Sequence, residues 1–490
     1  MKKILIFYNP IIEVSERYTR IVDSIIRENS NNKIFIVKCD GGDHLKNCIS
    51  NYKSDFYKCY ICKNKFNKLI SIHKKIKILK YSSNVQYKPE SFNNHSHLKN
   101  LCYKEINIGY GVNSAAISIL KDHKYDIQRN KILLNSIIRT SKLTIDFMMD
   151  NYKKKFDEVY VFNGRVSHYN SVVKFCIAKK INYNLFEVVA DKSKYRFFKN
   201  KVFHNTENFY NDLIINWKKE KTDKKYEIGE SFFKRNPIKG SSLNLDTLIF
   251  SDYQKRGLIP KILKDKKNFI TIIGSSRNET ESVEGWENKF LSGDDEDIIK
   301  QICFYFKDFQ FVYRVHPNLK LSNNTQIKNI KKLKEIKNLH VISSNSRIST
   351  TELIQKSSKI IVFGSTVGVE ANFYGKPVIC IGPSWYQKLD IAYKPENLKQ
   401  LEKLINNNFL ESRSKKDSIK YGYYIITRGK KLFDESLTVD LSFKLHESLL
   451  VFFFKLFKIV RVFNLNRFKL YIYAIKDPRV RKKIFNFFKT

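Results

Sequence analysis

Residues 359–383 read Lys359-Ile-Ile-Val-Phe-Gly-Ser-Thr-Val-Gly-Val-Glu-Ala-Asn-Phe-Tyr-Gly-Lys-Pro-Val-Ile-Cys-Ile-Gly-Pro383, and this pattern predicts one complete βαβ unit. The apolar, β-branched run Ile360–Phe363 is typical of a strand that is buried on both faces. A glycine breaks the run, and Ser365 and Thr366 stand where the N-cap of a helix belongs. After this helix, Val378–Ile381 is predicted to be the next buried strand.

This unit would place the hydroxyl and amide groups of Ser365 and Thr366 at the carboxyl edge of a parallel sheet. The dipole of the following helix favours an anion there, typically a phosphate. A purely structural helix cap is the alternative that the residues alone leave open.

Two more predicted strands end in polar turns within the same half of the chain. Phe309–Val315 runs into His316 and Pro317, with Arg314 beside the histidine, and Phe269–Ile273 is followed by a Gly-Ser-Ser turn that contains Ser275 and Ser276. A cation and an imidazole at one sheet edge, opposite a Ser-Thr helix start, are suited to binding a phosphodiester or diphosphate.

The order strand–Arg-x-His-Pro, strand–Gly-Ser-Thr-x-Gly-x-Glu-Ala and Gly-Lys-Pro-Val-Ile resembles the nucleotide-binding half of GT-B glycosyltransferases. The resemblance is strongest to bacterial capsule and surface-polysaccharide transferases, a group that includes Kdo and sialic acid (CMP-sugar) transferases. It implies that His316, Ser365 and Thr366 hold the donor phosphate and that Glu370 meets the donor ribose. Arg314, Ser275 and Ser276 join this predicted donor site.

The predicted fold class is α/β: a GT-B-like pair of Rossmann-like domains facing a cleft, with a helical basic C-terminal tail. Residues 1–240 would form the acceptor domain and 241–400 the nucleotide-sugar donor domain. Residues 401–490 would form a helical return segment and a basic amphipathic tail. The boundary follows a rise in charge density and a loss of apolar periodicity between residues 216 and 239.

The N-terminal half supplies candidate acceptor-side and catalytic residues. A predicted strand ends on Asn163-Gly-Arg165, and Asn163 and Arg165 would face the cleft from the sheet edge. Glu187 lies near the end of the next strand among apolar residues, where desolvation would raise the pKa of its carboxyl and suit it to general-base catalysis. The resemblance implies such an acidic residue, so Glu187 and His316 are the predicted catalytic residues. An ion pair or an exposed position for Glu187 is the alternative.

Four cysteines near the N-terminus, with His44 between them, have a spacing that partly fits a metal site. Zinc or an iron–sulfur cluster in a structural role is one interpretation, and free thiols in ordinary packing are the other. No cofactor is expected to be required for catalysis. The four candidate ligands are Cys39, Cys48, Cys59 and Cys62.

Composition limits the class of protein and its partners. The 490 residues carry a formal charge of +42 and are 42% hydrophobic and 14% aromatic, which excludes a largely disordered chain. The positive charge predicts an anionic partner, and without a nucleic-acid-binding motif an acidic membrane surface or an anionic substrate is favoured over nucleic acid. No secretory signal and no uncharged apolar run of about 18 residues are visible, which predicts a cytoplasmic protein with reduced thiols.

The last fifty residues predict attachment to the inner membrane. Residues 441–490 contain twelve Lys or Arg and only two acidic residues. Within Leu449–Phe463 the basic residues Lys455, Lys458 and Arg461 recur every third position among large apolar ones, as in helices that lie in an anionic interface. A helix that packs on the body of the protein is the alternative.

The predicted function is therefore transfer of a sugar from a nucleotide-activated donor, a CMP-sugar being one candidate, to a surface polysaccharide or glycolipid acceptor. A related enzyme that transfers a polyol phosphate from a CDP-activated donor fits the same fold. So does a nucleotide-sugar epimerase, although a soluble epimerase has no use for the basic tail. The non-enzymatic alternative is a membrane scaffold that binds anionic glycan.

Overall fold

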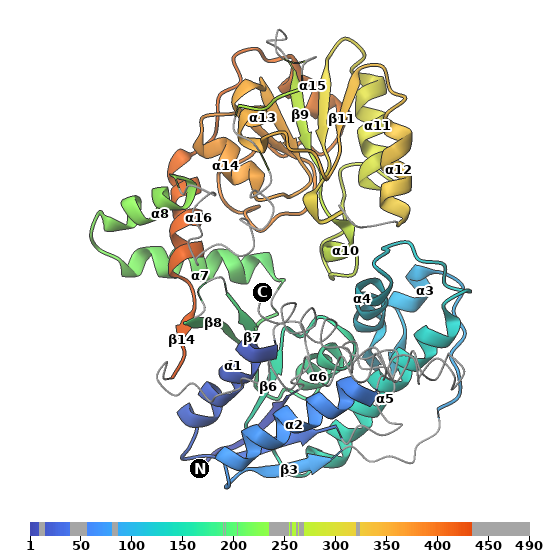
Figure 1. Ribbon diagram of the computed structural model, residues 1–490, viewed down its shortest axis with the longest axis vertical. Helices are drawn as coiled ribbons and strands as arrows, with labels where there is room; N and C mark the ends of the chain where they lie inside the picture. The colour runs from blue at the N-terminus through green and yellow to red at the C-terminus, as the bar shows by residue number, and fades with distance from the viewer. Residues whose placement is uncertain are drawn as a thin grey trace, which may run out of the picture.

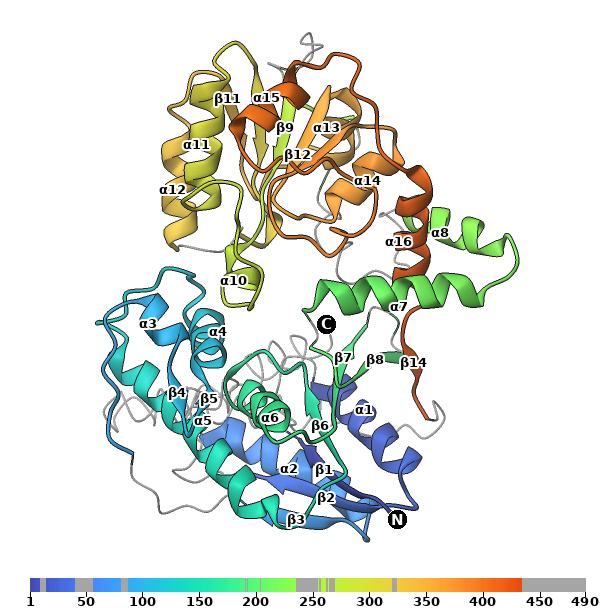
Figure 2. The same ribbon diagram turned by 180° about the vertical axis from the view of Figure 1, so that it is seen from behind.

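The computed structural model describes residues 1–8, 15–39, 56–80, 87–189, 191, 193–202, 204–234, 254, 257–260, 263, 269–319 and 324–433. Two α/β units, each built on a mainly parallel sheet, lie one above the other in Figure 1 and, seen from behind, in Figure 2. The predicted α/β, GT-B-like fold class is confirmed. The predicted domain boundary near residue 240 lies outside the described residues.

The N-terminal unit is a seven-stranded sheet in the order β14-β8-β7-β6-β1-β2-β3. The strands from β3 to β7 are parallel, and β8 and β14 add antiparallel pairs at one edge. Their bounds are β1 Lys3–Phe7, β2 Lys33–Lys38, β3 Lys77–Lys80, β6 Glu158–Phe162, β7 Tyr183–Val188, β8 Lys194–Lys199 and β14 Lys430–Lys431.

Alternation along β1 divides its side chains between two apolar layers, as the period of two of a strand requires. Ile4 and Ile6 pack in the cluster that includes residues of α1 (Ser15–Glu28) and α2 (Phe56–Ile72). Leu5 and Phe7 pack on the other side, among residues of three further helices. These helices are α4 (Gly109–Leu120), α5 (Lys131–Tyr152) and α6 (Ser167–Ala178). The short elements α3 (His95–Lys99), β4 (Cys102–Tyr103) and β5 (Ile106–Asn107) precede α4.

The C-terminal unit is a five-stranded parallel sheet in the order β11-β10-β9-β12-β13. All four strands predicted in this half are confirmed, with buried side chains throughout. The strands are β9 Ile270–Ile273, β10 Phe311–Arg314, β11 Leu339–Ile342, β12 Lys359–Val362 and β13 Val378–Cys380; the helices are α10 Arg277–Thr280, α11 Asp295–Tyr305, α12 Thr325–Leu333, α13 Thr350–Lys356, α14 Val367–Phe373 and α15 Leu398–Asn406.

After α15 the chain returns to the N-terminal unit. Helix α16 (Lys415–Thr427) packs against α7 (Thr206–Lys219) and α8 (Lys224–Lys234), and β14 then pairs with β8 at the edge of the N-terminal sheet. Figure 1 shows α16 descending beside α8 toward β14. The chain therefore passes between the units twice, once before β9 and once after α15.

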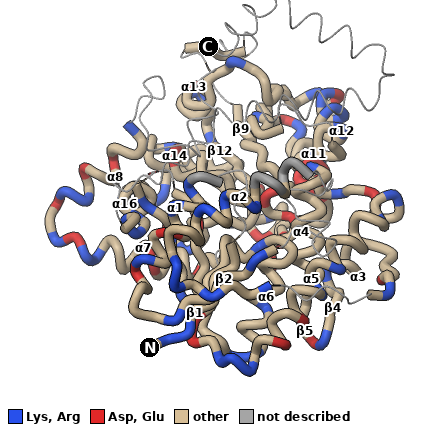
Figure 3. Tube along the Cα trace, turned by 60° about the horizontal axis from the view of Figure 1, so that its bottom comes forward, with Lys and Arg blue, Asp and Glu red and all other residues tan. Residues whose placement is uncertain are grey.

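Lys and Arg are spread over both units, as Figure 3 shows. The predicted basic helix within 449–463 lies outside the described residues. Within the part of the chain that the structure describes, no helix is both long and apolar enough to cross a membrane.

The turn between β12 and α14 requires glycine, which gives a test of the fold. Gly364 has φ of +94°, and a Cβ there would lie 1.9 Å from the Pro383 carbonyl oxygen. Gly375 also has positive φ, +77°, but a Cβ there would meet nothing within 4 Å. We expect Gly375→Ala to cost about 1–2 kcal/mol of stability, the usual cost of left-handed backbone, and Gly364→Ala to cost more because a backbone clash is added.

Urea unfolding followed by tryptophan fluorescence measures both effects. Equal unfolding midpoints for the two variants would contradict the close approach of the two loops.

Candidate functional site

The loops that follow β9 and β12 leave neighbouring strands at the same edge of the C-terminal sheet. Ile273 and Val362, near the strand ends, are direct neighbours in the parallel register. In the order β11-β10-β9-β12-β13 the chain turns from one side of the sheet to the other between these two strands. Ligands of open α/β sheets bind at such a switch point, outside the carboxyl ends of the strands. Ser275 and Ser365 therefore lie where the sequence predicted a binding site.

The start of α14 holds the predicted Ser-Thr pair. Thr366 is the N-cap residue but makes no side-chain capping bond, and its backbone is in the right-handed helical region. The Ser365 hydroxyl accepts a hydrogen bond from the Val367 amide at 3.3 Å. Both side chains are partly exposed. The hydroxyl of Thr366 is thus not used in capping, whereas that of Ser365 is bonded within the turn.

His316 follows β10, the strand beside β9, and is half-buried. Its Nδ1 accepts a hydrogen bond from the Asn318 amide at 3.2 Å. Burial lowers the pKa of His316, and the charge of Arg314 lowers it further, whereas Glu279 opposes the shift. The ring is therefore neutral near pH 7, and because Nδ1 accepts, its proton is on Nε2. His316 can donate one hydrogen bond from Nε2 to an oxygen of a ligand.

Arg314 does not fit the predicted contact with a donor phosphate. Its side chain is 2% exposed and donates to the carbonyl oxygens of Ser343 and Ser346, at 2.8 and 3.2 Å. The guanidinium thus holds the loop after β11 in place. The last side chain of a strand can turn either into the unit or toward the sheet edge, and that of Arg314 turns inward. Its remaining influence on the site is the positive charge that it places near His316.

Ser275 and Ser276 hold the loop after β9 in place. The Ser275 hydroxyl donates to the Asp295 carboxylate at 2.5 Å, and Asp295 also receives the Arg277 guanidinium at 3.2 Å. Ser276 is the N-cap residue of α10 and is 6% exposed. The Ser275 hydroxyl already donates its proton to Asp295, so it can only accept a hydrogen bond from a ligand. The main role of these two serines is therefore to hold the shape of the loop.

In the N-terminal unit, three polar side chains form a row across neighbouring strands. Phe162 of β6 pairs with Phe186 of β7, so Asn163 and Glu187 each come one residue later at the same level. Glu187 is in turn the direct partner of Arg196 on β8. The Asn163 amide donates to one carboxylate oxygen of Glu187, and the Val188 amide donates to the other at 2.9 Å.

The environment of Glu187 matches the prediction. Burial raises the pKa of its carboxyl, and the bonds from Asn163 and Val188 and the charges of Arg196 and Arg165 only partly offset this. A carboxyl that is held in one orientation and has a raised pKa is suited to general-base chemistry.

The structure adds residues that the sequence analysis did not single out. Arg196 is 6% exposed, and Arg428 follows α16. Tyr421 of α16 is buried, which raises the pKa of its phenol to about 12; Arg428 and Arg196 lower this pKa, and Glu370 raises it. Charged groups of both units thus change the pKa of Tyr421. A single arginine in the strand sequence Lys-Tyr-Arg-Phe-Phe-Lys is only a weak signal for a site.

Glu370 lies on the C-terminal side of this group. Burial raises the pKa of its carboxyl to about 7. A second link starts at Ser365, whose carbonyl accepts a bond from the Tyr386 hydroxyl at 2.9 Å, and the Tyr386 ring lies 6.4 Å from that of Tyr421. The predicted phosphate-binding turn is therefore linked through Tyr386 to Tyr421, the residue whose pKa responds to Arg196.

Arg165, predicted on the acceptor side, also reaches the other unit. It donates to the carbonyl oxygen of Glu279, in α10, at 2.7 Å. Lys99 pairs with Glu281 at 3.1 Å nearby. These bonds join the loop after β9 to the N-terminal unit. Figure 2 shows α10 on the side of the C-terminal unit that faces α4.

The cysteine site stays a prediction. Cys59 and Cys62 lie on α2 and Cys39 follows β2, whereas Cys48 lies outside the described residues. Among the residues that are described, no three His, Cys, Asp or Glu side chains gather as metal ligands would.

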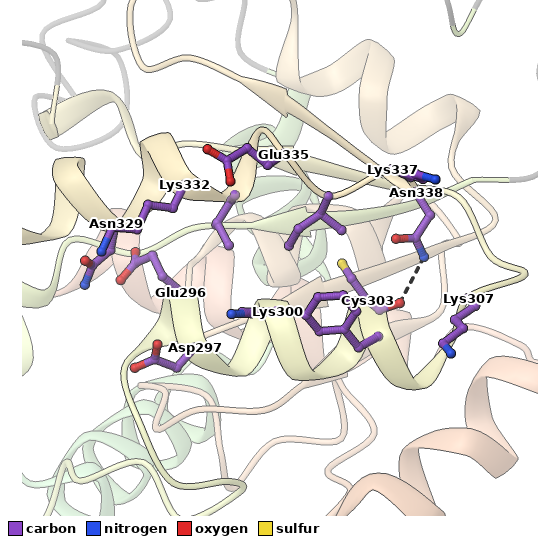
Figure 4. Close-up of a pocket in the computed structure, with 13 residues that line it drawn as sticks. Glu296, Asp297, Lys300, Cys303, Lys307, Asn329, Lys332, Glu335, Lys337 and Asn338 are labelled. Atoms are coloured by element: carbon purple, nitrogen blue, oxygen red, sulfur yellow. Dashed lines mark hydrogen bonds between the residues drawn. The ribbon is translucent and has the colours of Figure 1, made fainter.

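A groove of about 790 Å³ runs between α11 and α12 (Figure 4). Lys300, Lys307, Lys332 and Lys337 line it together with apolar residues such as Leu333. None of the predicted donor-binding or acceptor-side residues lines this groove.

Comparison with solved structures gives weak likenesses. Two are *Thermosulfurimonas dismutans* KpsC structures: the β Kdo 2,7 transferase (12% identity, 57% of this chain and 80% of that chain, TM-score 0.34) and the β Kdo 2,4 transferase (15%, 55% and 79%, TM-score 0.35). A third is the *Methanocaldococcus jannaschii* UDP-GlcNAc 2-epimerase in complex with UDP-GlcNAc and UDP (13%, 86% and 98%, TM-score 0.25). TM-scores this low support no inference about function.

No curated protein sequence matches the chain. The family model described as "Capsule polysaccharide biosynthesis protein" matches residues 307–408. This segment contains His316, Ser365, Thr366 and Glu370, and the match confirms for it the resemblance to capsule polysaccharide proteins that its motifs indicate.

Proposed function

We propose that this chain is a glycosyltransferase of capsule or related surface-polysaccharide synthesis. It would transfer a sugar from a nucleotide-activated donor to a glycan or glycolipid acceptor. The observation that carries the proposal is a pair of half-sites: hydroxyl and imidazole donors at the switch point of one sheet, and an oriented carboxyl of raised pKa at the edge of the other. The capsule family match to residues 307–408 supports it.

The C-terminal unit would bind the donor. The Nε2–H of His316 and the hydroxyls of Ser365 and Thr366 would donate to oxygens of the donor phosphate. These bonds become stronger as negative charge collects on the departing nucleotide, so they stabilise the transition state more than the ground state. Glu370, close behind in α14, would accept a bond from a ribose hydroxyl.

The N-terminal unit would supply the base. Glu187 would take the proton of the acceptor hydroxyl as its oxygen attacks the anomeric carbon of the donor sugar and the bond to the phosphate oxygen breaks. The amide of Asn163 holds the carboxylate in the required orientation. A polyol-phosphate transferase could use the same base, with phosphorus in place of the anomeric carbon as the atom attacked.

Nucleotide binding is the first test, because a non-enzymatic scaffold has no reason to bind one. We expect at least one of CMP, CDP, UDP and GDP to raise the melting temperature of the full chain, since a ligand that binds the native state stabilises it. His316→Ala and the double variant Ser365→Ala/Thr366→Ala should each weaken that binding about 10- to 100-fold, as expected for loss of charge-assisted bonds of about 1.5–3 kcal/mol.

His340→Ala is the matched control for the histidine, because His340 lies on β11 of the same sheet, away from the switch point. Unchanged affinity in the His316 and Ser365/Thr366 variants would rule out the proposed donor site.

Glu187→Gln should abolish turnover while leaving nucleotide affinity unchanged, because it removes the base and keeps the shape of the side chain. In the unmodified chain, activity should rise with pH as the Glu187 carboxyl ionises, and since burial raises its pKa, the rise should lie above the range of an ordinary glutamate. The measurement is a pH profile of kcat, and near-normal activity of the variant would place the base elsewhere.

We also propose that the basic tail attaches the enzyme to the inner membrane, where its acceptor would be presented. Twelve basic residues within 441–490 would attract an anionic leaflet with about 1 kcal/mol for each residue near the surface. Deletion of the residues after Leu445 should release the protein from anionic vesicles in a flotation assay and spare nucleotide binding. Equal flotation of the full and shortened chains would contradict this attachment.

A further inference from the structure

Three arginines from distant parts of the chain lie near Glu187 or near its partner on the next strand. Arg165 follows β6, and Arg196 stands on β8 directly opposite Glu187. Arg428 comes two residues before Lys430, which pairs with Tyr195, the neighbour of Arg196. The edge pairing of β14 with β8 therefore brings Arg428 to the side of Arg196.

Electrostatic effects place Arg428 close to Arg196, and both Arg165 and Arg196 close to His204. Burial lowers the pKa of Arg196 to about 10, and the charge of Arg428 is the next cause. Burial likewise lowers the pKa of His204 to about 3, and the charges of Arg165 and Arg196 add to the shift. Several like charges are thus held together in a place with little water.

The hydrogen bonds of Arg165 and Arg428 leave capacity for a ligand. One Nη of Arg165 donates to the Glu279 carbonyl, but the buried Nε–H of Arg165 has no partner among the described residues. The buried Nε–H of Arg428 has none there either. Arg196 lies over the Phe198 ring at 4.5 Å, which fixes the plane of its guanidinium. The carboxyl nearest in the register, Glu187, has a pKa raised by burial and so compensates the charge poorly.

We propose that Arg165, Arg196 and Arg428 form an anion site that takes a carboxylate or phosphate group of the molecule bound beside Glu187. Planar guanidinium groups suit both anions, because each presents paired N–H donors to paired oxygens. The site lies in the row that contains the proposed base, not at the switch point of the C-terminal sheet. It therefore recognises a different group from the phosphate assigned to His316, Ser365 and Thr366.

This inference rests on the proposed function only in identifying the bound molecule as a substrate. An anionic group held beside Glu187 would fix the position of that substrate and so determine which of its hydroxyls reaches the base. A substrate without the anion would leave the buried Nε–H groups of Arg165 and Arg428 unpaired, which is a strong basis for rejection.

The test uses the full chain in the Ser365→Ala/Thr366→Ala background, which weakens phosphate binding at the switch point. Melting temperature is followed with sodium acetate or sodium phosphate against sodium chloride of equal ionic strength. We expect one of the two anions to stabilise the protein above chloride, and Arg428→Gln to weaken that binding about tenfold or more. A stronger response to acetate identifies a carboxylate ligand, and a stronger response to phosphate identifies a phosphate ligand.

Lys431→Gln is the matched control, since it removes the same charge from an exposed position three residues later. Arg165→Gln is a second variant in case Arg428→Gln fails to fold, and it should weaken anion binding in the same way. Equal responses of the Arg428 and Lys431 variants, or no stabilisation by either anion, would overturn the proposal.

Nucleotide affinity measured with Arg428→Gln alone separates the two hypotheses. Loss of anion binding with nucleotide binding intact supports both. An anion response in a chain that binds no nucleotide would refute the donor site and leave the anion site standing.

Discussion

Glu187 on β7 and Arg196 on β8 are direct partners in the N-terminal sheet, and the row of polar side chains at this sheet edge depends on their pairing. Both side chains are largely withdrawn from water, so each changes the ionisation of the other and of the groups around it. Burial would hold the carboxyl protonated if it acted alone. The guanidinium and the amide of Asn163 oppose this effect and partly offset it.

In both units the polar residues discussed above lie at or just after the carboxyl ends of parallel strands. The residue types at these strand ends differ between the two units. In the C-terminal unit small residues follow β9 and β12, and small side chains leave the backbone open to close approach. In the N-terminal unit the strand ends carry Asn163 and Glu187, whose side chains bond to each other. One surface is therefore suited to binding phosphate oxygens and the other to moving a proton.

The sequence predicted the parts of this arrangement that depend on local pattern. Buried β-branched runs and the turns after them fixed β9, β10, β12 and β13, and chain order alone indicated that Ser365 and His316 lie at one edge. It could not predict that Arg314 turns into the unit, because alternation does not tell which way the last side chain of a strand faces. Arg428 was missed for another reason: its closeness to Arg196 depends on a pairing between segments that are far apart in the chain.

The edge strand β14 has a consequence for biosynthesis. The N-terminal sheet receives its last strand from Lys430–Lys431, which the ribosome makes only after the whole C-terminal unit. Domains generally fold in the order in which they are synthesised. Here the first unit can form most of its sheet early but must wait for the second unit to be finished before its edge is complete. A chain that is cut short before residue 428 would retain Asn163, Glu187 and Arg196 but would lack both β14 and Arg428.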